Sequence, residues 1–531
     1  MTDSADNKPS KALFWGCFIA LITTSFGFIT RMFLLDDPAI TDTLLGLDPA
    51  EVGKFKGIQI WPFAISIILF SLIIDKVGYK FSMIFAAVCQ IIWAIMGIVG
   101  LNIAQGGDAA TGASMLYWGG LILALGNGTV EAFINPVVAT MFTKDKTKWL
   151  NILHAGWPGG LVIAGVIVIF MGDNFGWAVK LGIIVVPAFI YLGMLIKEQF
   201  PVQERVASGV SYKEMLSEFG VFGAAVVAVL IYLQLDTEFP GKESMWLGLC
   251  IAFVAAFGFY TKSPGRGLMG ILILIMIPLA TTEIGTDGWI SGIMANAVTF
   301  DAGWILVYTS VIMMGLRFLA GPIVHALNPL PLLILSSVLA IAGLAALAGA
   351  GAAGVGMIFV AATLYALGKT FFWPTMLGIV SEQTPKGGAL TLNAVSGIGM
   401  LAVGVLGFPL IGAIQANKEI SEVASTGNAA LVKDGAVIEE ATEAKNIYKI
   451  INYEVLTDTA VDEKLADASE EDKKIVADAR AGSAPKALGS MTVFPLSMLI
   501  AYIAIYMYFR SRGGYKPVEL GGGDESSASD G

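Results

Sequence analysis

The chain has 531 residues, of which 56% are hydrophobic and 14% are charged, and its mean hydropathy is +0.75. A typical soluble domain carries roughly a quarter charged residues, and a soluble protein of this size cannot hide so much apolar surface. The composition excludes a disordered chain, and it excludes a disulfide scaffold because the three cysteines (Cys17, Cys89 and Cys250) lie in apolar runs. The net charge of −10 offers no basic surface to nucleic acid. These features indicate an integral membrane protein.

The apolar runs are long enough for transmembrane helices, which need about 20 residues. They lack the strict alternation of the roughly ten-residue strands of a membrane β-barrel. We therefore predict an all-α polytopic membrane protein with about fourteen transmembrane helices. In chain order these are residues 12–34, 57–75, 80–101, 115–141, 149–171, 176–197, 219–235, 245–260, 267–295, 302–325, 331–350, 355–381, 389–414 and 490–510.

Basic residues predict the orientation of these helices. With the N-terminus inside, the predicted cytoplasmic segments hold Lys8, Lys11, Lys76, Lys80, Lys144, Lys146, Lys148, Lys197, Arg205, Lys213, Lys262, Arg266, Lys386, Arg510, Arg512 and Lys516. The short loops on the other side hold Lys54, Lys56 and Lys242. Cytoplasmic loops are enriched in Lys and Arg, so we expect a multi-pass protein of the inner (plasma) membrane with both termini cytoplasmic. The N-terminus does not resemble a cleavable signal, because its apolar run is longer than a signal peptide requires.

The predicted spans group into domains. Residues 1–197 form an N-terminal six-helix bundle, and residues 198–262 form a linker with an inserted transmembrane hairpin. Residues 263–510 form a C-terminal six-helix bundle that includes a long acidic extracytoplasmic loop, 415–489, in which residues 443–456 and 461–480 are predicted to be helical. Residues 511–531, rich in Gly, Ser and Asp, are predicted to be a disordered cytoplasmic tail.

Short matches that recur in the same order indicate an internal repeat. Residues 23–27 read Thr-Thr-Ser-Phe-Gly, and residues 281–285 read Thr-Thr-Glu-Ile-Gly. Glu131 precedes Pro136 by five residues, as Lys369 precedes Pro374, and the next helix of each half opens with Leu-Asn. The first and last six spans therefore read as two copies of one six-helix unit, a common plan for transporters.

A motif after the second span resembles that of a known family. Residues 71–80 read Ser-Leu-Ile-Ile-Asp-Lys-Val-Gly-Tyr-Lys, which is similar to the G-x-x-x-D-R-x-G-R-K loop of the major facilitator superfamily. This resemblance implies two six-helix bundles and a cytoplasmic gate that contains Asp75, Gly78, Lys80 and, in the second half, Arg317. Asp75 is expected to accept hydrogen bonds from a helix N-terminus of the other half.

The fourth and fifth spans resemble one branch of this superfamily. Residues 126–136 (Gly-Asn-Gly-Thr-Val-Glu-Ala-Phe-Ile-Asn-Pro) and 150–159 (Leu-Asn-Ile-Leu-His-Ala-Gly-Trp-Pro-Gly) are similar to helices of the fucose:proton symporter-like sugar transporters. The stretch from Thr282 to Trp289 also resembles their seventh helix. The resemblance implies a central cavity that contains Glu131. The first span carries Arg31, whereas that branch carries an acidic residue there.

Charged residues inside the bilayer are costly and therefore mark candidate functional positions. We expect Glu131 and Glu283 to take part in coupling. We expect Lys369 to bind the solute or to form an ion pair with Glu131 or Glu283. The predicted substrate-binding residues are Arg31, Gln59, Glu131, Asn135, Asn151, His154, Trp157, Glu283, Asp287, Lys369, Trp373 and Asn393. For each of them a purely structural role is the alternative.

These observations favour a secondary active transporter that moves a small polar solute, with a sugar as the first choice and an organic anion as the alternative. A lipid translocase or a non-transporting sensor is a further alternative. The sequence has neither a Walker-type phosphate loop nor a His-Glu-x-x-His motif, so we expect no enzyme, no metal and no cofactor apart from H⁺ or Na⁺ as coupling ion. The expected partners are the solute and the bilayer, with no nucleic acid, and the protein is expected to be a monomer.

Overall fold

The computed structural model describes residues 10–47, 49–288, 290, 298 and 303–520. Within these residues, thirteen helices are long and apolar enough to cross a membrane. A further pair, α15 (Gly303–Phe318) and α16 (Ala320–Leu327), is bent by 68° and brings the number to as many as fourteen. The predicted all-α polytopic fold is confirmed. Residues 291–295 of the predicted span 267–295, and Trp289, lie outside the described residues.

The first bundle is built from residues 11–195. Its elements are α1 (Lys11–Leu35), η1 (Ala39–Leu44), α2 (Pro49–Gly57), α3 (Trp61–Val77), α4 (Tyr79–Gln105), α5 (Ala109–Met141), α6 (Lys146–His154), α7 (Gly156–Met171), η2 (Gly172–Asn174), α8 (Trp177–Gly182) and α9 (Val185–Leu195). Gly78 forms the turn between α3 and α4 with a φ of +82°, a conformation that glycine adopts without strain. This turn ends α3 three residues after Asp75.

The second bundle follows a linker and an inserted hairpin. The linker contains α10 (Glu204–Ala207), and the hairpin consists of α11 (Tyr212–Glu238) and α12 (Glu243–Thr261). The bundle contains α13 (Gly267–Ala280), η3 (Thr281–Gly285), α15, α16, α17 (Pro329–Ala353), α18 (Val355–Lys369), α19 (Phe372–Gln383), η5 (Pro385–Gly387), α20 (Gly388–Ala402), η6 (Val403–Gly407), α21 (Phe408–Ser425) and α24 (Val493–Ser511).

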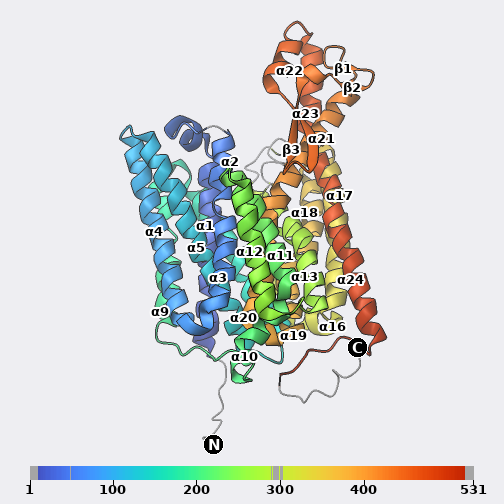
Figure 1. The fold of residues 1–531 in the computed structure, drawn as a ribbon. Coiled ribbons are helices and arrows are strands. Elements are labelled where there is room, and N and C mark those ends of the chain that lie inside the picture. The colour runs from blue at the N-terminus through green and yellow to red at the C-terminus, as the bar shows by residue number, and fades with distance from the viewer. Residues whose placement is uncertain (1–9, 48, 289, 291–297, 299–302, 521–531) are drawn as a thin grey trace, which may run out of the picture.

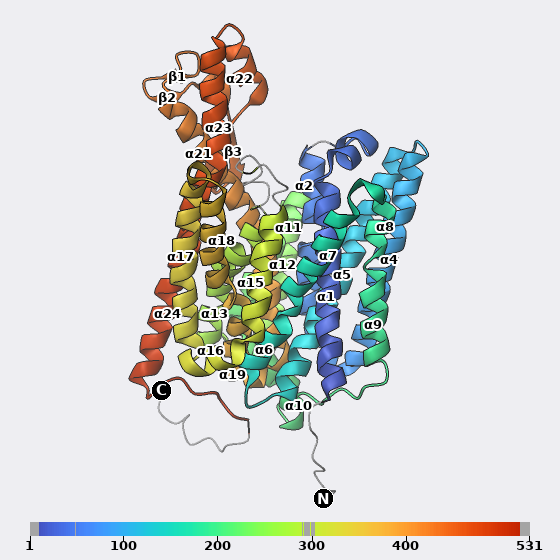
Figure 2. The ribbon, with the colours of Figure 1, turned by 180° about the vertical axis from the view of Figure 1, so that it is seen from behind.

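The two bundles stand side by side (Figures 1 and 2), and α6, α3 and α7 of the first contact α19, α20 and α15 of the second. The helix ends near residues 11 and 511 lie at one end of the molecule, which we call the terminus side. Residues 415–489 project from the opposite end, the cap side. Both names are geometric and carry no assignment to a compartment.

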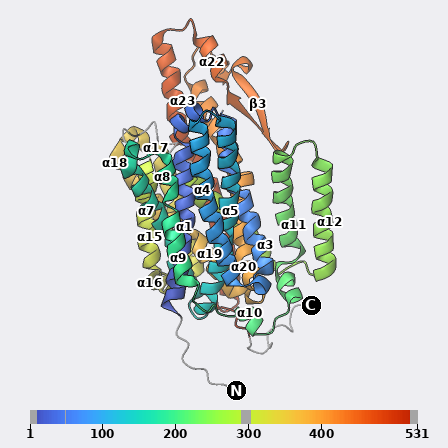
Figure 3. The same cartoon turned by 90° about the vertical axis from the view of Figure 1, so that its left-hand side faces the viewer.

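The inserted hairpin lies outside both bundles (Figure 3). Helix α11 packs on α20 and α13, and α12 packs on α11. Only 6% of the most apolar stretch of α12 is buried, so its apolar side chains are available to lipid. Helix α11 is interrupted at Gly220, where φ is +66° and a Cβ atom would lie 2.0 Å from the backbone nitrogen of Gly265.

Residues 415–489 form a small folded cap with a core of Val423, Leu431, Ala441, Val461, Leu465 and Val476. Its elements are the end of α21, β1 (Val432–Lys433), β2 (Ala436–Val437), η7 (Glu439–Ala441), β3 (Thr442–Ile447), β4 (Ile451–Leu456), α22 (Asp458–Leu465) and α23 (Glu470–Ser490). The prediction of a helix over residues 443–456 is wrong, because β3 and β4 pair there as an antiparallel hairpin. Tyr448 and Lys449 both have positive φ, the geometry of a tight hairpin turn. Helices α22 and α23 occupy most of the predicted 461–480 helix.

The tail after α24 lies against the terminus side of the second bundle. Gln383 donates to the carbonyl of Lys516 (2.7 Å), and the N–H of Val518 donates to the carbonyl of Glu382 (2.8 Å). The tyrosine hydroxyl of Tyr515 donates to Oε2 of Glu382 (2.7 Å). The sequence predicts disorder from residue 511, whereas the structure places residues 515–518 in contact with α19.

Candidate functional site

Several helices are interrupted at the candidate site between the two bundles. Helix α6 ends at His154, α18 ends at Lys369, and the Thr281–Gly285 segment of the next element is a π-helix that follows Pro278. Such interruptions leave backbone carbonyl and N–H groups without partners in their own helix, and these groups must be satisfied by side chains. Charged residues at these positions therefore have a structural reason to converge.

Arg317 of α15 satisfies two of these helix ends. Its Nε donates to the carbonyl of Thr370 (2.7 Å), and its Nη1 donates to the carbonyl of His154 (2.9 Å). A cation is favoured beside helix C-termini because carbonyls carry partial negative charge there. Its Nη2 donates to Oε1 of Glu283 (2.8 Å), and the Arg317 side chain is only 1% exposed. Arg317 thus lies in an interior ion pair and also contacts the first bundle, and its expected part in the gate stays a prediction.

Glu283 completes the arrangement from the π-helix. Its Oε2 accepts a hydrogen bond from the backbone N–H of Trp373 (3.1 Å) in the first turn of α19. A carboxylate at a helix N-terminus is stabilised by the exposed N–H groups. Glu283 is thus held by a cation on one side and a helix N-terminus on the other, and it bridges α15 and α19.

Lys369 pairs with Asp287, and its ammonium group lies 5.2 Å from the ring centre of Tyr365. The predicted ion pair with Glu131 or Glu283 is not formed, whereas the alternative, that Lys369 binds the solute, stays a prediction. The hydroxyl of Tyr365 donates to the carbonyl of Thr282 (2.5 Å), one of the groups that the π-helix leaves accessible. Among its described residues, the second bundle therefore has two ion pairs in its interior, Arg317–Glu283 and Lys369–Asp287.

Glu131 of α5 has a different environment. Nδ2 of Asn135 donates to Oε2 of Glu131 (2.8 Å), and Oδ1 of Asn135 lies 3.0 Å from Nε2 of His154, which donates to it when that nitrogen carries the proton. Within the described part of the chain, Glu131 makes no ion pair, although Arg317 interacts with it electrostatically. A chain of contacts thus joins Glu131 to Arg317 across the two bundles.

Two buried asparagines, Asn151 of the first bundle and Asn393 of the second, each donate a hydrogen bond to the opposite bundle. Nδ2 of Asn151 donates to Oγ1 of Thr375 (3.2 Å), and Nδ2 of Asn393 donates to the carbonyl of Ala132 (2.8 Å). Oδ1 of Asn151, Oδ1 of Asn393 and Nε2 of Gln59 are buried without a hydrogen-bond partner among the described residues. Unsatisfied buried polar atoms are rare in proteins and suit the hydroxyl groups of a solute.

The side chains of three other predicted substrate-binding residues do not contact the chain of residues that joins Glu131 to Arg317. Arg31 donates to the carbonyls of Phe55 (2.5 Å) and Lys56 (3.3 Å) in the last turn of α2, which is a helix-capping contact. The ring of Trp157 lies 5.4 Å from that of Phe28. Trp373 joins only through its backbone N–H.

The terminus side contains a second set of contacts between the bundles. Asp75 forms an ion pair with Arg205 of α10, and not with a helix N-terminus of the other half as predicted. The N-terminus of α20 instead receives Gln203, whose Oε1 accepts from the N–H of Ala389 (3.3 Å). The linker therefore contacts both Asp75 of the first bundle, through Arg205, and the N-terminus of α20 in the second bundle, through Gln203. Lys80 is exposed.

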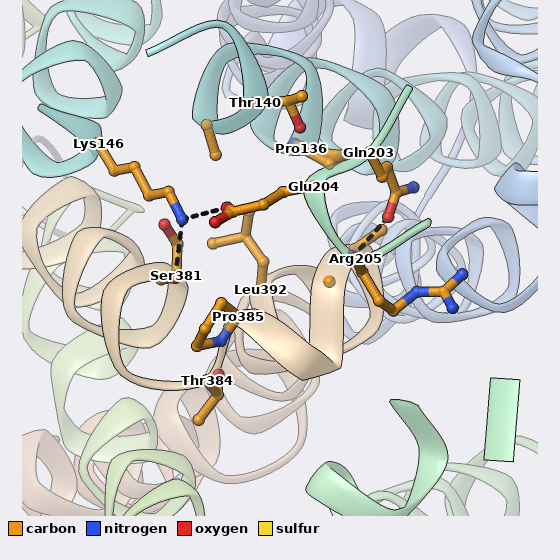
Figure 4. Close-up of a pocket in the computed structure, with 13 residues that line it drawn as sticks. Pro136, Thr140, Lys146, Gln203, Glu204, Arg205, Ser381, Thr384, Pro385 and Leu392 are labelled. Carbon is orange, nitrogen blue, oxygen red and sulfur yellow. Dashed lines mark hydrogen bonds and ion pairs between the residues drawn. The ribbon is translucent and has the colours of Figure 1, made fainter. Parts of the chain in front are cut away.

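Lys146 and Glu382 close the same junction. Nζ of Lys146 contacts Glu204 (2.6 Å) and the carbonyl of Ser381 (3.4 Å), and Figure 4 shows it pointing toward both. Oε1 of Glu382 accepts from Oγ1 (2.5 Å) and from the N–H (3.2 Å) of Thr147 at the start of α6. The cavity lined by Lys146, Glu204 and Ser381 has a volume of about 30 Å³, which leaves room for little more than water. Gln203 and Glu382 were not predicted from the sequence as parts of this junction. The one available signal was Glu382, an acidic residue at the end of a predicted span and near basic residues.

The fold and the interior define the class of protein: a polytopic helical membrane protein in which two bundles enclose buried charges, as in solute carriers. The family model of the Major Facilitator Superfamily matches residues 12–408, three quarters of the chain, and the protein therefore belongs to this superfamily of membrane transporters. No curated protein matches its sequence.

Solved transporter structures share the fold. The proton:xylose symporter XylE bound to 6-bromo-6-deoxy-D-glucose has a TM-score of 0.57 at 12% identity, over 94% of this chain and 95% of that one. FucP, a Major Facilitator Superfamily transporter in the outward conformation, has a TM-score of 0.54 at 14% identity, over 92% and 98%. The human organic anion transporter TETRAN has a TM-score of 0.56 at 11% identity, over 94% and 100%. At such identities the likeness shows the fold alone.

Proposed function

We propose that the chain is a proton-coupled symporter that moves a small, neutral, polyhydroxylated solute of the sugar class by alternating access. The observation that carries this proposal is the isolation of Glu131, which is 6% exposed, contacts a neutral amide and has no ion-pair partner among the described residues. A buried carboxylate without a cation costs several kcal/mol, and binding a proton removes that cost.

Matched charges favour a neutral solute over an organic anion. Among the buried cations, Arg317 and Lys369 are already neutralised by Glu283 and Asp287, and Arg31 donates to the carbonyls of Phe55 and Lys56 at the end of α2. An anion would have to displace one of these carboxylates and leave it buried without a partner, which is strongly unfavourable. A neutral polyol requires only hydrogen-bonding groups, and the unpartnered atoms of Asn151 and Asn393 provide them.

The contacts of Glu131 also favour H⁺ over Na⁺ as the coupling ion. Sodium is bound by a shell of several oxygen atoms, whereas Glu131 contacts an N–H donor, the amide of Asn135, whose Oδ1 in turn lies against the imidazole of His154. Proton transfer needs one group that gains and loses charge, and Glu131 meets that requirement by itself.

For orientation, we propose that the terminus side faces the cytoplasm, since most Lys and Arg residues outside the cap cluster there. In that orientation the contacts of Glu382 and Lys146 close the cytoplasmic side, and the two bundles must separate there before solute leaves inward. Asp75 and Arg205 act on this gate through the linker.

The test uses proteoliposomes with an imposed pH gradient and a panel of radiolabelled sugars and organic anions. Glu131→Gln is expected to abolish concentrative uptake and to keep exchange of labelled for unlabelled solute, because the amide is permanently neutral. Glu238→Gln, a change of an acid at the cap end of α11, is the matched control and should leave both assays intact. Concentrative uptake that survives in Glu131→Gln would remove this residue from coupling.

A further inference from the structure

A polar pocket lies away from the central network, where the inserted hairpin meets the second bundle on the terminus side. Its volume is about 360 Å³, at the lower end of the range for small-molecule sites. The start of α11, the loop between α12 and α13, and η5 form its walls. The lining side chains are Glu214, Ser217, Glu218, Ser263, Arg266 and Lys386.

The walls of this pocket are held by backbone hydrogen bonds. At the interruption of α11, the N–H of Val221 donates to the carbonyl of Ser263 (3.0 Å). On the other side of the break, the N–H of Arg266 donates to the carbonyl of Glu218 (3.1 Å). The charged side chains therefore project from a fixed frame, so little conformational freedom is lost when a ligand binds.

The charges of the lining are balanced. Nη1 of Arg266 lies 3.8 Å from Oε2 of Glu218, beyond hydrogen-bond distance. That oxygen is buried and has no hydrogen-bond partner among the described residues. Lys386 interacts electrostatically with both Glu214 and Glu218. Two carboxylates and two cations in one pocket suit a ligand that carries one positive and one negative group.

The surroundings of the pocket are apolar on the side of α12. Phe259 is 82% exposed and Tyr260 is 52% exposed, and both lie within four residues of Ser263 at the pocket wall. Helix α12 is the outermost helix of the hairpin (Figure 3), so these side chains face the bilayer. A ligand in the pocket can thus have an acyl chain along α12 while its head group contacts the charges.

We propose that this pocket binds the head group of a zwitterionic phospholipid with a primary amine, namely phosphatidylethanolamine. Its ammonium group donates hydrogen bonds to Glu218 and Glu214, and its phosphate accepts from the guanidinium of Arg266 and from Lys386. The bound lipid joins the inserted hairpin to η5 of the second bundle. Without the lipid, α11 makes this contact and the exposed helix α12 does not take part in it.

The test is native mass spectrometry of the detergent-purified full-length protein with phosphatidylethanolamine, phosphatidylcholine and phosphatidylglycerol of identical acyl chains. Phosphatidylethanolamine should bind at least about tenfold more tightly than the other two, because the trimethylated amine cannot donate hydrogen bonds and the anionic lipid has no amine. Glu218→Gln and Lys386→Met should each weaken its binding by about tenfold. Lys262→Met, at an exposed position of the same loop, should leave it unchanged.

Equal affinity for the ethanolamine and choline lipids would overturn the proposal, and so would an ethanolamine preference that survives both pocket variants. Lys386 is the exposed middle residue of η5, so its variant keeps the test valid if Glu218→Gln does not fold. Free O-phosphoethanolamine that binds as tightly as the lipid would assign the site to a soluble zwitterion and refute the lipid. None of these variants touches Glu131, so the outcome is independent of the proposed transport function.

Discussion

Glu382 links the two bundles on the terminus side. Its Oε1 accepts two hydrogen bonds from Thr147, and the carboxylate lies at the N-terminus of α6, where negative charge is favoured. A hydrogen bond to a charged group contributes about 1.5–3 kcal/mol, and two from one carboxylate together contribute about 2–4 kcal/mol, because they are not additive. Glu382→Ala is therefore expected to raise the population that is open on the terminus side by roughly 30- to 1,000-fold.

The assay is the reaction rate of a cysteine introduced at Thr140, which lines the closed junction, after replacement of Cys17, Cys89 and Cys250 by serine. A membrane-impermeant maleimide applied from the terminus side should react at least about 30-fold faster in Glu382→Ala, in proportion to the open population. Tyr515→Phe is the control, because it removes only the hydrogen bond from the tail. A rate in Glu382→Ala that equals that of the control would refute the reasoning.

Two further predictions concern the other charged pairs. Asp75→Asn and Arg205→Met should each raise the reactivity of Thr140→Cys, and the double variant should add little, because both remove the same ion pair; additive effects would show that the two residues act separately. Arg317→Met should lower the unfolding free energy by about 3–5 kcal/mol, because it leaves Glu283 buried without its cation. Thermal melting checks this, and Arg317→Met with Glu283→Gln should regain part of the loss; no recovery would contradict the explanation.

The fold was predictable because membrane helices follow from length and hydropathy, which are local properties of the sequence. The interior charges were predictable as candidates for the same reason, since an acid or a base within an apolar run is conspicuous. Prediction of secondary structure from the local sequence failed where contacts between distant segments decide the conformation. The cap hairpin β3–β4 mixes the charged residues Glu443, Lys445 and Glu454 with polar and apolar ones, and a mixture of this kind also fits a surface helix.

The partners of the interior charges were not predictable from the sequence. Glu283 and Asp287 are four residues apart, so a regular helix would place them on one face. The π-helix at Thr281–Gly285 changes the helical repeat at this point, and the two carboxylates contact different cations on different helices. Arg317 was assigned to the gate by analogy with a loop motif, whereas its side chain contacts the carboxylate of Glu283 and the carbonyls of His154 and Thr370. Such contacts depend on packing between segments distant in the sequence.

On the proposed function, the network itself explains how a proton can control the two bundles. Arg317 holds the carbonyl of His154 in the first bundle and the carboxylate of Glu283 in the second. When Glu131 is protonated, Glu283 is the carboxylate that neutralises Arg317. When Glu131 releases its proton, a second negative charge appears on the same chain of contacts and competes with Glu283 for the guanidinium. Because the competing carboxylates belong to different bundles, proton release changes the free energy of the contact between the bundles, which is what coupling to alternating access requires.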